Sequence, residues 1–391
     1  TWPARRSIDR SDLHTNPRAR SPTARAQVMT QELWALRVDE GHKAPPPPNT
    51  DGTRFPSHAR VALRYDLTRD PGLRARYESA FGTVRMGVLL EDMDAIAGSV
   101  AWRHVDDADP TTDPPILVTA SVEEIAVRES LSLQKDYALT SQVVYTGSSS
   151  LVIAVELSPV DDIRANDPVL SGVFTYVARK RDGSGAERVY PLVPETPDER
   201  RRYDDVKKKQ DALKELRAKK QQHKAGTSSF SAEAASEDAE RIDALIKASR
   251  VARDFPGQAD VGQVEMGRTA LRNAFMVHPQ ERNTAGNMFG GSLIRRALEL
   301  AFATAFQFGG DEPRMVALDR VDFHRPVTIG SLLALGSIIT LAEPSAEPGL
   351  PAYVHVHVSA RTWRPQTRES NLNNSFSFVF AIDNPPRPLK S

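Results

Sequence analysis

The stretch HPQERNTAGNMFGGSLIRRALELAFATA, residues 278–305, places a dense polar turn before two glycines and a strongly apolar segment. Gly290 and Gly291 lie at the start of this segment, which predicts a helix whose first N–H groups are free and open to a ligand. These donors and the helix dipole could polarise a carbonyl group and hold the oxyanion that forms when it is attacked. Asn283 and Asn287 could orient the carbonyl or a water molecule. The chemistry then lacks only a base.

A helical pattern nearer the N-terminus supplies a candidate base. In GVLLEDMDAIAGSVAW, residues 87–102, four apolar residues form one stripe at i, i+4, i+7 and i+11: Leu89, Met93, Ile96 and Val100. Asp94 lies away from Glu91 and Asp92, on a side formed by small or apolar residues: Leu90, Ala97, Gly98 and Ala101. We therefore expect a half-buried carboxylate, which could act as a general base for water or attack a carbonyl directly.

The elements around these residues repeat along the chain. Segments rich in Val, Ile, Thr and Tyr follow the first helix and predict strands, and the same order returns after a second helix predicted over 291–308. Two of the later strands show the alternation of a half-buried sheet: Val354, Val356 and Val358, then Phe376, Phe378 and Phe380. The two copies lie about 200 residues apart, which indicates an internal repeat.

One long buried helix before a consecutive antiparallel sheet is typical of the hotdog fold, in which the sheet wraps the helix. The predicted fold class is therefore α+β, with two hotdog domains paired into a double hotdog. The second helix is apolar nearly all round, as expected of an enclosed helix. On its one polar edge Arg295 and Glu299, at i and i+4, are expected to pair.

Changes in composition divide the chain of 391 residues into four parts. Residues 1–59 form a basic, transit-like or mobile extension that ends in a proline-rich spacer, and residues 60–196 are the first hotdog domain. Residues 197–262 are a charged linker, expected to be helical, and residues 263–391 are the second hotdog domain.

Composition excludes several function classes. Lys plus Arg and Asp plus Glu both number 51, so no net field draws the chain to nucleic acid or to an anionic membrane. The chain has no cysteine, which excludes thiolate catalysis and Cys-ligated zinc. No apolar run reaches about 18 residues, so no membrane span is expected. His355 and His357 share a strand face without an apparent third ligand, and no metal site is predicted.

The repeat predicts one working site per chain, formed between the polar turn of one unit and the helix of the other. Aligning the glycines at the two helix starts places Leu298 at the position of Asp94, and Ser79 near the position of Asn283. Only the combination of Asn283 with Asp94 keeps both polar groups. Glu299 lies one residue late and could partly replace the lost acid.

Each candidate also has a structural interpretation. Asn283 and Asn287 are of a type common in turns, where they form local hydrogen bonds. Asp94 could be a salt-bridged structural acid. Arg325, in DFHRPV, could clamp a phosphate group by charge-assisted hydrogen bonds or lie on the surface without a ligand.

Taken together, HPQERN, FGGSLIRRALELAFATA, GVLLEDMDAIAG and VDFHRPVTIGSLL resemble the acyl-CoA thioesterases of the double-hotdog class, and most closely the mitochondrial acyl-CoA thioesterase 9 type. The resemblance covers residues 60–385 apart from the charged linker. It implies that Asn283 and Asp94 carry hydrolysis. It also implies an acyl-CoA substrate, no metal, no cofactor, a homo-oligomer in the form of a trimer of double-hotdog chains, and a location in the mitochondrial matrix.

The predicted function is hydrolysis of a fatty acyl-CoA to free acid and CoA. Asp94 would activate water or attack the carbonyl, with Asn283 and the helix start after Gly290 and Gly291 as the oxyanion and water site, and with Arg325 as a possible CoA-binding residue. A hotdog hydratase would instead use a His near the helix start, where this chain has Phe289. The remaining alternative is a non-catalytic scaffold or assembly subunit of a larger mitochondrial complex.

Overall fold

The computed structural model describes residues 47–109, 111–160, 168–225, 264–319, 321–343 and 350–383, together with Glu347 and a few isolated residues between 240 and 254. Most of the transit-like segment and the second half of the charged linker lie outside these residues. Within the described parts of the chain, no helix is both long and apolar enough to cross a membrane.

The N-terminal half forms one helix-and-sheet unit. Its helices and strands are α2 (Pro56–Ala59), β1 (Val61–Tyr65), α3 (Pro71–Tyr77), α4 (Met86–Val105), β2 (Ile116–Val127), β3 (Tyr137–Thr146), β4 (Ser150–Pro159) and β5 (Leu170–Arg179). The helix predicted over 87–102 is thus confirmed and extends by one residue at its start and three at its end.

The C-terminal half repeats this order with one additional short strand, β8. In chain order its elements are η3 (Met266–Thr269), β6 (Leu271–Met276), η4 (Pro279–Glu281), α7 (Gly290–Gly309), β7 (Pro313–Leu318), β8 (Val321–Asp322), β9 (Leu332–Glu343), β10 (Ala352–Arg364) and β11 (Glu369–Ile382), where η marks a 3-10 turn. The helix predicted over 291–308 is confirmed as α7, and Gly310 ends it in the left-handed conformation, with φ of 76°.

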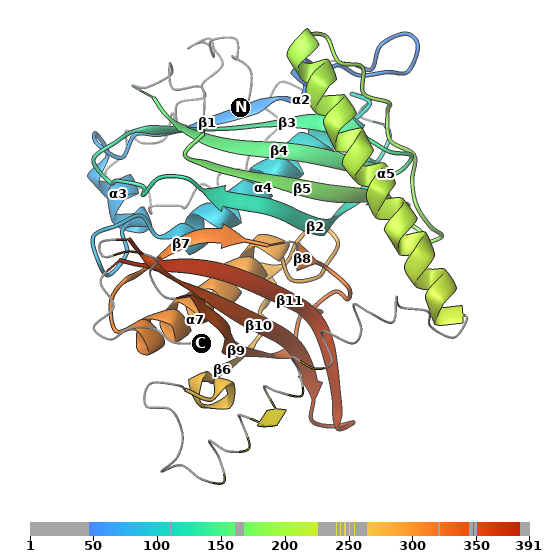
Figure 1. Cartoon of the computed structure of the whole chain (residues 1–391). Coiled ribbons are helices and arrows are strands. Elements are labelled where there is room, and N and C mark those ends of the chain that lie inside the picture. The colour runs from blue at the N-terminus through green and yellow to red at the C-terminus, as the bar shows by residue number, and fades with distance from the viewer. Residues whose placement is uncertain are drawn as a thin grey trace.

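One 11-stranded antiparallel sheet joins the two units (Figure 1). Its order is β1-β3-β4-β5-β2-β7-β11-β10-β9-β6, with β8 beside β2, so each half has the same order when counted inward from its own edge. The halves meet where β2 pairs with β7 through Ile125–Leu318 and Ala126–Ala317. The α+β class and the large antiparallel sheet are confirmed.

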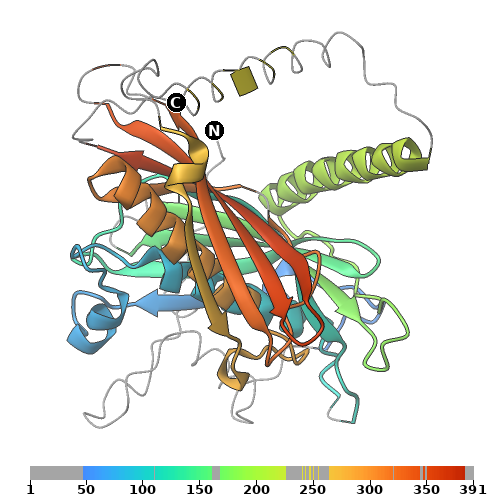
Figure 2. The same cartoon turned by 90° about the horizontal axis from the view of Figure 1, so that it is seen from below.

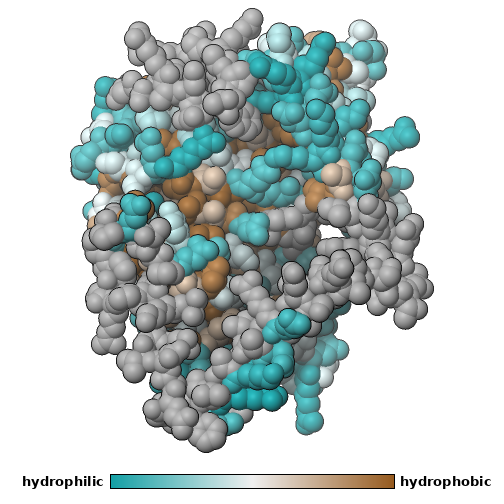
Figure 3. All heavy atoms as spheres, viewed as in Figure 1, coloured by the Kyte–Doolittle hydropathy of each residue, from teal (hydrophilic) through white to brown (hydrophobic). Residues whose placement is uncertain are grey.

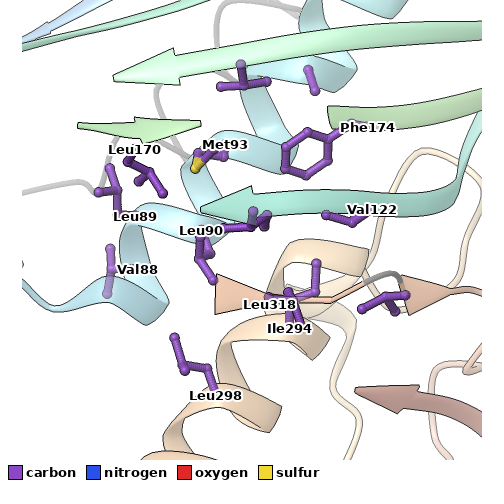
Figure 4. Close-up of a cluster of buried hydrophobic side chains, with 14 of the residues drawn as sticks. Val88, Leu89, Leu90, Met93, Val122, Leu170, Phe174, Ile294, Leu298 and Leu318 are labelled. Atoms are coloured by element: carbon purple, nitrogen blue, oxygen red, sulfur yellow. The ribbon is translucent and has the colours of Figure 1, made fainter. Parts of the chain in front are cut away.

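The long helices α4 and α7 lie side by side against one face of this sheet, behind it in Figure 1. Each contacts the strands of its own half and also the other helix. Figure 4 shows the apolar contact between the units: Met93 of α4 lies near Leu170 and Phe174 of β5, while Leu90 extends down toward α7, where Ile294 and Leu298 lie.

The opposite face of the first half-sheet carries α5 (Pro197–Ala225). Tyr203 of α5 packs on Tyr145 of β3 at 5.2 Å between ring centroids, and Lys209 forms an exposed ion pair with Glu124 of β2. The rest of α5 runs out past the sheet, as Figure 2 shows in light green. Seen from the side of α5, apolar surface gathers in the middle of the face, and hydrophilic side chains lie toward its rim (Figure 3).

Candidate active site

The polar turn before α7 is built by its own asparagines. The side-chain oxygen of Asn283 accepts hydrogen bonds from the backbone N–H groups of Ala285 (2.9 Å) and Asn287 (3.0 Å). The backbone of Asn283 closes the same turn, because its N–H donates to the carbonyl of Asn287 (2.7 Å) and its carbonyl accepts from Gly286 (3.1 Å). With its oxygen committed to the turn, Asn283 has its amide N–H₂ group to offer a ligand.

The turn is anchored to α7 by an ion pair. Glu281 accepts hydrogen bonds from two guanidinium nitrogens of Arg296, the Nε at 2.9 Å, and the carbonyl of Glu281 accepts the N–H of Phe289 at 2.7 Å. The Arg296 guanidinium also lies 4.0 Å from the centre of the Phe275 ring. These contacts fix where the turn stands relative to the helix start.

Asp94 of α4 lies directly against the start of α7. Its Oδ2 accepts the backbone N–H of Gly291 at 2.7 Å, and the side chain is fully buried. The residue before α7, Phe289, provides no side-chain cap, so the carboxylate of the opposite helix fills this role. A carboxylate at a helix N-terminus is also stabilised by the helix dipole.

Two sequence-based expectations change here. Asp94 is buried completely, whereas a half-buried carboxylate was expected. The N–H of Gly291 is engaged by that carboxylate, whereas it was expected to be free for an oxyanion. The N–H of Gly290 lies before the first intrahelical bond of α7, from Leu293 to Phe289, and so remains a candidate oxyanion donor.

Two residues that sequence reasoning missed hold the other oxygen of Asp94. Tyr176 of β5 donates from its hydroxyl to Oδ1 at 2.7 Å, and Thr119 of β2 donates to the same atom at 3.2 Å. Tyr176 and Thr119 face each other across the β2–β5 pair. They are 82 and 25 residues from Asp94 in sequence, so no local spacing could have linked them to it.

The three acids of α4 have separate surroundings. The helical pattern predicted that Asp94 lies on a different side of the helix from Glu91 and Asp92, and the structure agrees. Glu91 reaches across to α7, where it accepts from Arg295 at 2.6 Å and also from the hydroxyl of Ser292. Asp92 points the other way and accepts from the hydroxyls of two buried tyrosines: Tyr65, at 3.1 Å, and Tyr77. The carboxylate of Asp94 is the one that accepts the backbone N–H of Gly291.

The prediction that Arg295 pairs with Glu299 is wrong. Arg295 pairs with Glu91 of the other helix, and Glu299 pairs with Arg85 at the end of the loop before α4. The i, i+4 argument treats the helix as isolated, whereas opposite charges on the partner helix are available here. Because Glu299 is bound at the surface by Arg85, it does not stand in for the missing acid of the second unit.

Glycine is required where the helices cross. A Cβ atom at Gly291 would lie 3.0 Å from the backbone of Glu91 and 2.7 Å from the Phe289 ring. At Gly290 it would lie 3.0 Å from Asp94 Oδ2 and 3.4 Å from the ring of Phe323. Three of these four distances are shorter than an ordinary van der Waals contact, so the absence of a side chain at the two glycines lets a carboxylate approach the backbone.

Arg325 lies on the loop that passes the helix start. Phe323 is tied to β2 by a hydrogen bond to the carbonyl of Ala120 (3.0 Å), and Val327 accepts the N–H of Met288 (2.8 Å). Between them the exposed guanidinium of Arg325 donates to the side-chain oxygen of Asn371 at 2.9 Å. A basic side chain therefore stands on a loop that borders the Gly290 turn.

The other unit carries the same turn without the same chemistry. Ser79 accepts the N–H groups of Phe81 and Thr83 with its hydroxyl, as Asn283 does with its amide oxygen. The strand registers and the shared offset place apolar residues at the positions of Asp94, Tyr176 and Thr119: Leu298, Phe380 and Met315. All three are at most 4% exposed.

The space beside this second turn is filled by aromatic rings. Phe81 lies 5.8 Å from Phe302 and 5.5 Å from Phe306, measured between ring centroids. The position of Phe302 on α7 corresponds to that of Gly98 on α4. Among the described residues, no group of three His, Asp or Glu side chains could hold a metal ion.

A buried carboxylate against a glycine-rich helix start, with asparagine amides in the preceding turn, is chemically suited to attack on an acyl carbonyl. No protein-family model matches the chain. The chain is similar to acyl-coenzyme A thioesterase 2, chloroplastic, of Humulus lupulus, with 34% identity over 90% of this chain and 80% of that protein. For acyl-coenzyme A thioesterase 4, mitochondrial, of the same plant, identity is 32% over 90% of this chain and 67% of that protein.

Acyl-coenzyme A thioesterase 9, mitochondrial, of Mus musculus is 32% identical over 82% of this chain and 70% of that protein. The chain therefore belongs to the acyl-coenzyme A thioesterase family, and the resemblance seen in the sequence is confirmed. Members of this family are thioester hydrolases. Two of the three relatives carry a mitochondrial name and one a chloroplastic name.

Proposed function

We propose that this chain hydrolyses a fatty acyl-CoA at the contact between Asp94 and the start of α7. The observation that carries the proposal is the 2.7 Å hydrogen bond from the Gly291 N–H to the fully buried carboxylate. It brings an acid of one unit to the polar turn of the other, as the predicted site requires. Family membership supplies the thioester as the group to be cleaved.

In the water-mediated route, the oxygen of a water molecule bonds to the thioester carbon while Asp94 takes a proton from that water. The N–H of Gly290 and the amide of Asn283 donate to the oxyanion, and Asn287 shapes the turn that presents them. Collapse of the tetrahedral intermediate breaks the C–S bond, and the proton held by Asp94 passes to the CoA sulfur. The alternative is direct attack by Asp94, which forms a mixed anhydride that water then hydrolyses.

The two units are proposed to be the hotdog domains 60–196 and 263–391 of a double hotdog, separated by the linker 197–262 and preceded by the extension 1–59. The matching strand order of the half-sheets, each against its own long helix, supports this assignment. Arg325 is proposed to bind a CoA phosphate, since it borders the helix start on an exposed loop. A trimer of such chains and a location in the mitochondrial matrix complete the proposal.

The test is release of CoA thiol from short to long acyl-CoAs by wild-type protein and by Asp94→Asn. The variant keeps the size of the side chain but cannot take up the proton, and a fall in kcat of about 1,000-fold is expected. Asp92→Asn is the matched control, because Asp92 is on the same helix, equally buried and also bound by tyrosine hydroxyls. Its kcat should stay near that of the wild type.

Equal loss of activity in the two variants, with both folded, would assign Asp94 a structural part only. No thiol release by wild-type protein from any acyl-CoA would overturn the hydrolase and favour the scaffold. To separate base from nucleophile, a single turnover in H₂¹⁸O is followed by mass analysis of the peptide that contains Asp94. Label in that carboxylate would indicate the anhydride route.

A further inference from the structure

The hydroxyl of Tyr176 has two acceptors within reach on one residue. It lies 2.7 Å from the Oδ1 atom of Asp94 and 2.8 Å from the backbone carbonyl oxygen of Asp94. A phenol has a single hydrogen, so it can satisfy only one of these acceptors fully at a time. Tyr176 is itself only 4% exposed, and water therefore has little access to either contact.

This geometry suits both protonation states of the acid. When Asp94 is ionised, the phenol O–H donates to Oδ1. When Asp94 carries the proton taken from water, its own O–H can donate to the phenol oxygen, and the phenol O–H can turn to the backbone carbonyl of Asp94. A buried group left without a partner in one of the two states would raise the barrier by the cost of that unmade bond.

The second unit provides an internal comparison. At the position of Tyr176 it has Phe380, the same ring without the hydroxyl, and at the position of Asp94 it has Leu298. Phe380 is fully buried and packs edge-on against Phe302 at 6.3 Å between centroids. The fold thus accommodates the ring alone at this place in the sheet. The hydroxyl is present only where the acid is present.

We propose that Tyr176 is a positioning residue of the hydrolysis reaction, one whose hydroxyl is the hydrogen-bond partner of Asp94 in both its ionised and its protonated form. The proposal rests on the proposed function of Asp94. Tyr176 acts through that acid and not on the substrate. It follows that its removal changes the chemical step and the pH at which Asp94 ionises, while acyl-CoA binding is kept.

The experiment compares Tyr176→Phe with Tyr65→Phe in the full chain. Tyr65 is a matched control, since it is 2% exposed and donates from its hydroxyl to Asp92 on the same helix. Tyr176→Phe is expected to lower kcat about tenfold, the effect of one lost buried hydrogen bond, with KM changed little. The acid limb of its pH profile for kcat/KM should move upward by up to about one pH unit, because the hydrogen bond to the ionised carboxylate is stronger than the bond made by the protonated form, and its loss therefore costs the ionised form more.

Tyr65→Phe should lose a similar amount of thermal stability and show the wild-type pH profile. The proposal is overturned if Tyr176→Phe keeps the wild-type kcat and pH profile. It is also overturned if both variants lose activity equally with unmoved profiles, which would indicate a structural effect. Asp94→Asn is assayed beside them to distinguish failure of this inference from failure of the proposed function. If Asp94→Asn is inactive and Tyr176→Phe is unaffected, the inference about Tyr176 is refuted and the proposed function of Asp94 stands.

Discussion

Both units anchor a polar turn to a long helix, but only the first unit places a buried acid beside the helix start of the other. Each must hold its polar turn against a helix, and each does so with a pair of polar side chains at corresponding positions. In the first unit Tyr77 donates to Asp92, and in the second Arg296 donates to Glu281. The donor and the acceptor have exchanged places, yet both turns are anchored.

At the position of Asp94 the units differ in kind. Asp94 is surrounded by hydrogen-bond donors, whereas Leu298 at the corresponding position is surrounded by apolar residues. The anchor is present in both units, whereas the acid and its hydrogen-bond donors occur together in the first unit only. A buried carboxylate without its donors would be costly, and the second unit has apolar residues at the positions of Asp94, Tyr176 and Thr119.

The largest expected effect comes from making the first unit like the second. Asp94→Leu introduces the residue of the second unit and removes the proton acceptor. We expect kcat to fall by about 1,000-fold or more, measured as CoA thiol release. The substitution also removes the carboxylate that accepts the Gly291 N–H, so folding should be checked by circular dichroism.

Leu298→Asp in the same chain is the reciprocal change. It should not restore activity, because Phe302 and Phe81 fill the space beside the second turn. Recovery of even a tenth of wild-type turnover in the double variant would show that the second unit retains a usable site.

The next effect concerns His104 near the end of α4, where the second unit has Phe308. Burial lowers the pKa of His104 from 6.5 to about 4, so the folded state resists protonation. Between pH 6.5 and 4 His104 is protonated in the unfolded chain but not in the folded one. The free energy of unfolding therefore decreases as the pH falls through this range, by about 3 kcal/mol in total. His104→Phe should reduce that pH dependence in urea unfolding at pH 7 and pH 4.5. An unchanged difference between the two pH values would contradict the assignment.

A smaller effect, on stability, should distinguish Gly291 of α7 from Gly87 of α4, the two glycines where the helices cross. A Cβ atom at Gly291 meets the backbone of Glu91, which cannot move aside, whereas one at Gly87 meets mainly the flexible side chain of Arg295. Gly291→Ala should therefore cost about 2 kcal/mol of unfolding free energy and Gly87→Ala clearly less. Equal costs in chemical denaturation would mean that the crossing is symmetric.

The smallest effect is expected at the ion pair between Arg85 and Glu299. Both side chains are more than 40% exposed, so solvent screens the pair. Arg85→Ala should change the unfolding free energy by less than about 1 kcal/mol and leave turnover unchanged. A drop in turnover would mean that the second turn communicates with the first.

Local patterns in the sequence were sufficient to predict the two long helices and to single out Asp94. The stripe through Met93 and the glycines before α7 place both helices to within a few residues, because period and turn chemistry are properties of short segments. Asp94 could be singled out for the same reason, from its place on the small-residue side of one helix.

What could not be predicted depends on contacts between segments distant in the chain. Thr119 and Tyr176 reach Asp94 only because β2 and β5 pair and lie over α4. The partner of Arg295 is on the other helix, and no pattern within α7 indicates this. The capture of the Gly291 N–H by a carboxylate likewise requires the crossing distance between two helices, which only the structure gives.

The pairing of Glu91 with Arg295 has a consequence for how the halves recognise each other. These residues occupy corresponding positions, so each meets its own counterpart where the two helices cross. In an assembly of two identical copies of one unit, glutamate would face glutamate, or arginine would face arginine, in a largely buried place. Such like-charge contacts would be repulsive. Joining two different halves in one polypeptide permits opposite charges at the centre of the contact, and it disfavours self-association of either half with another copy of itself.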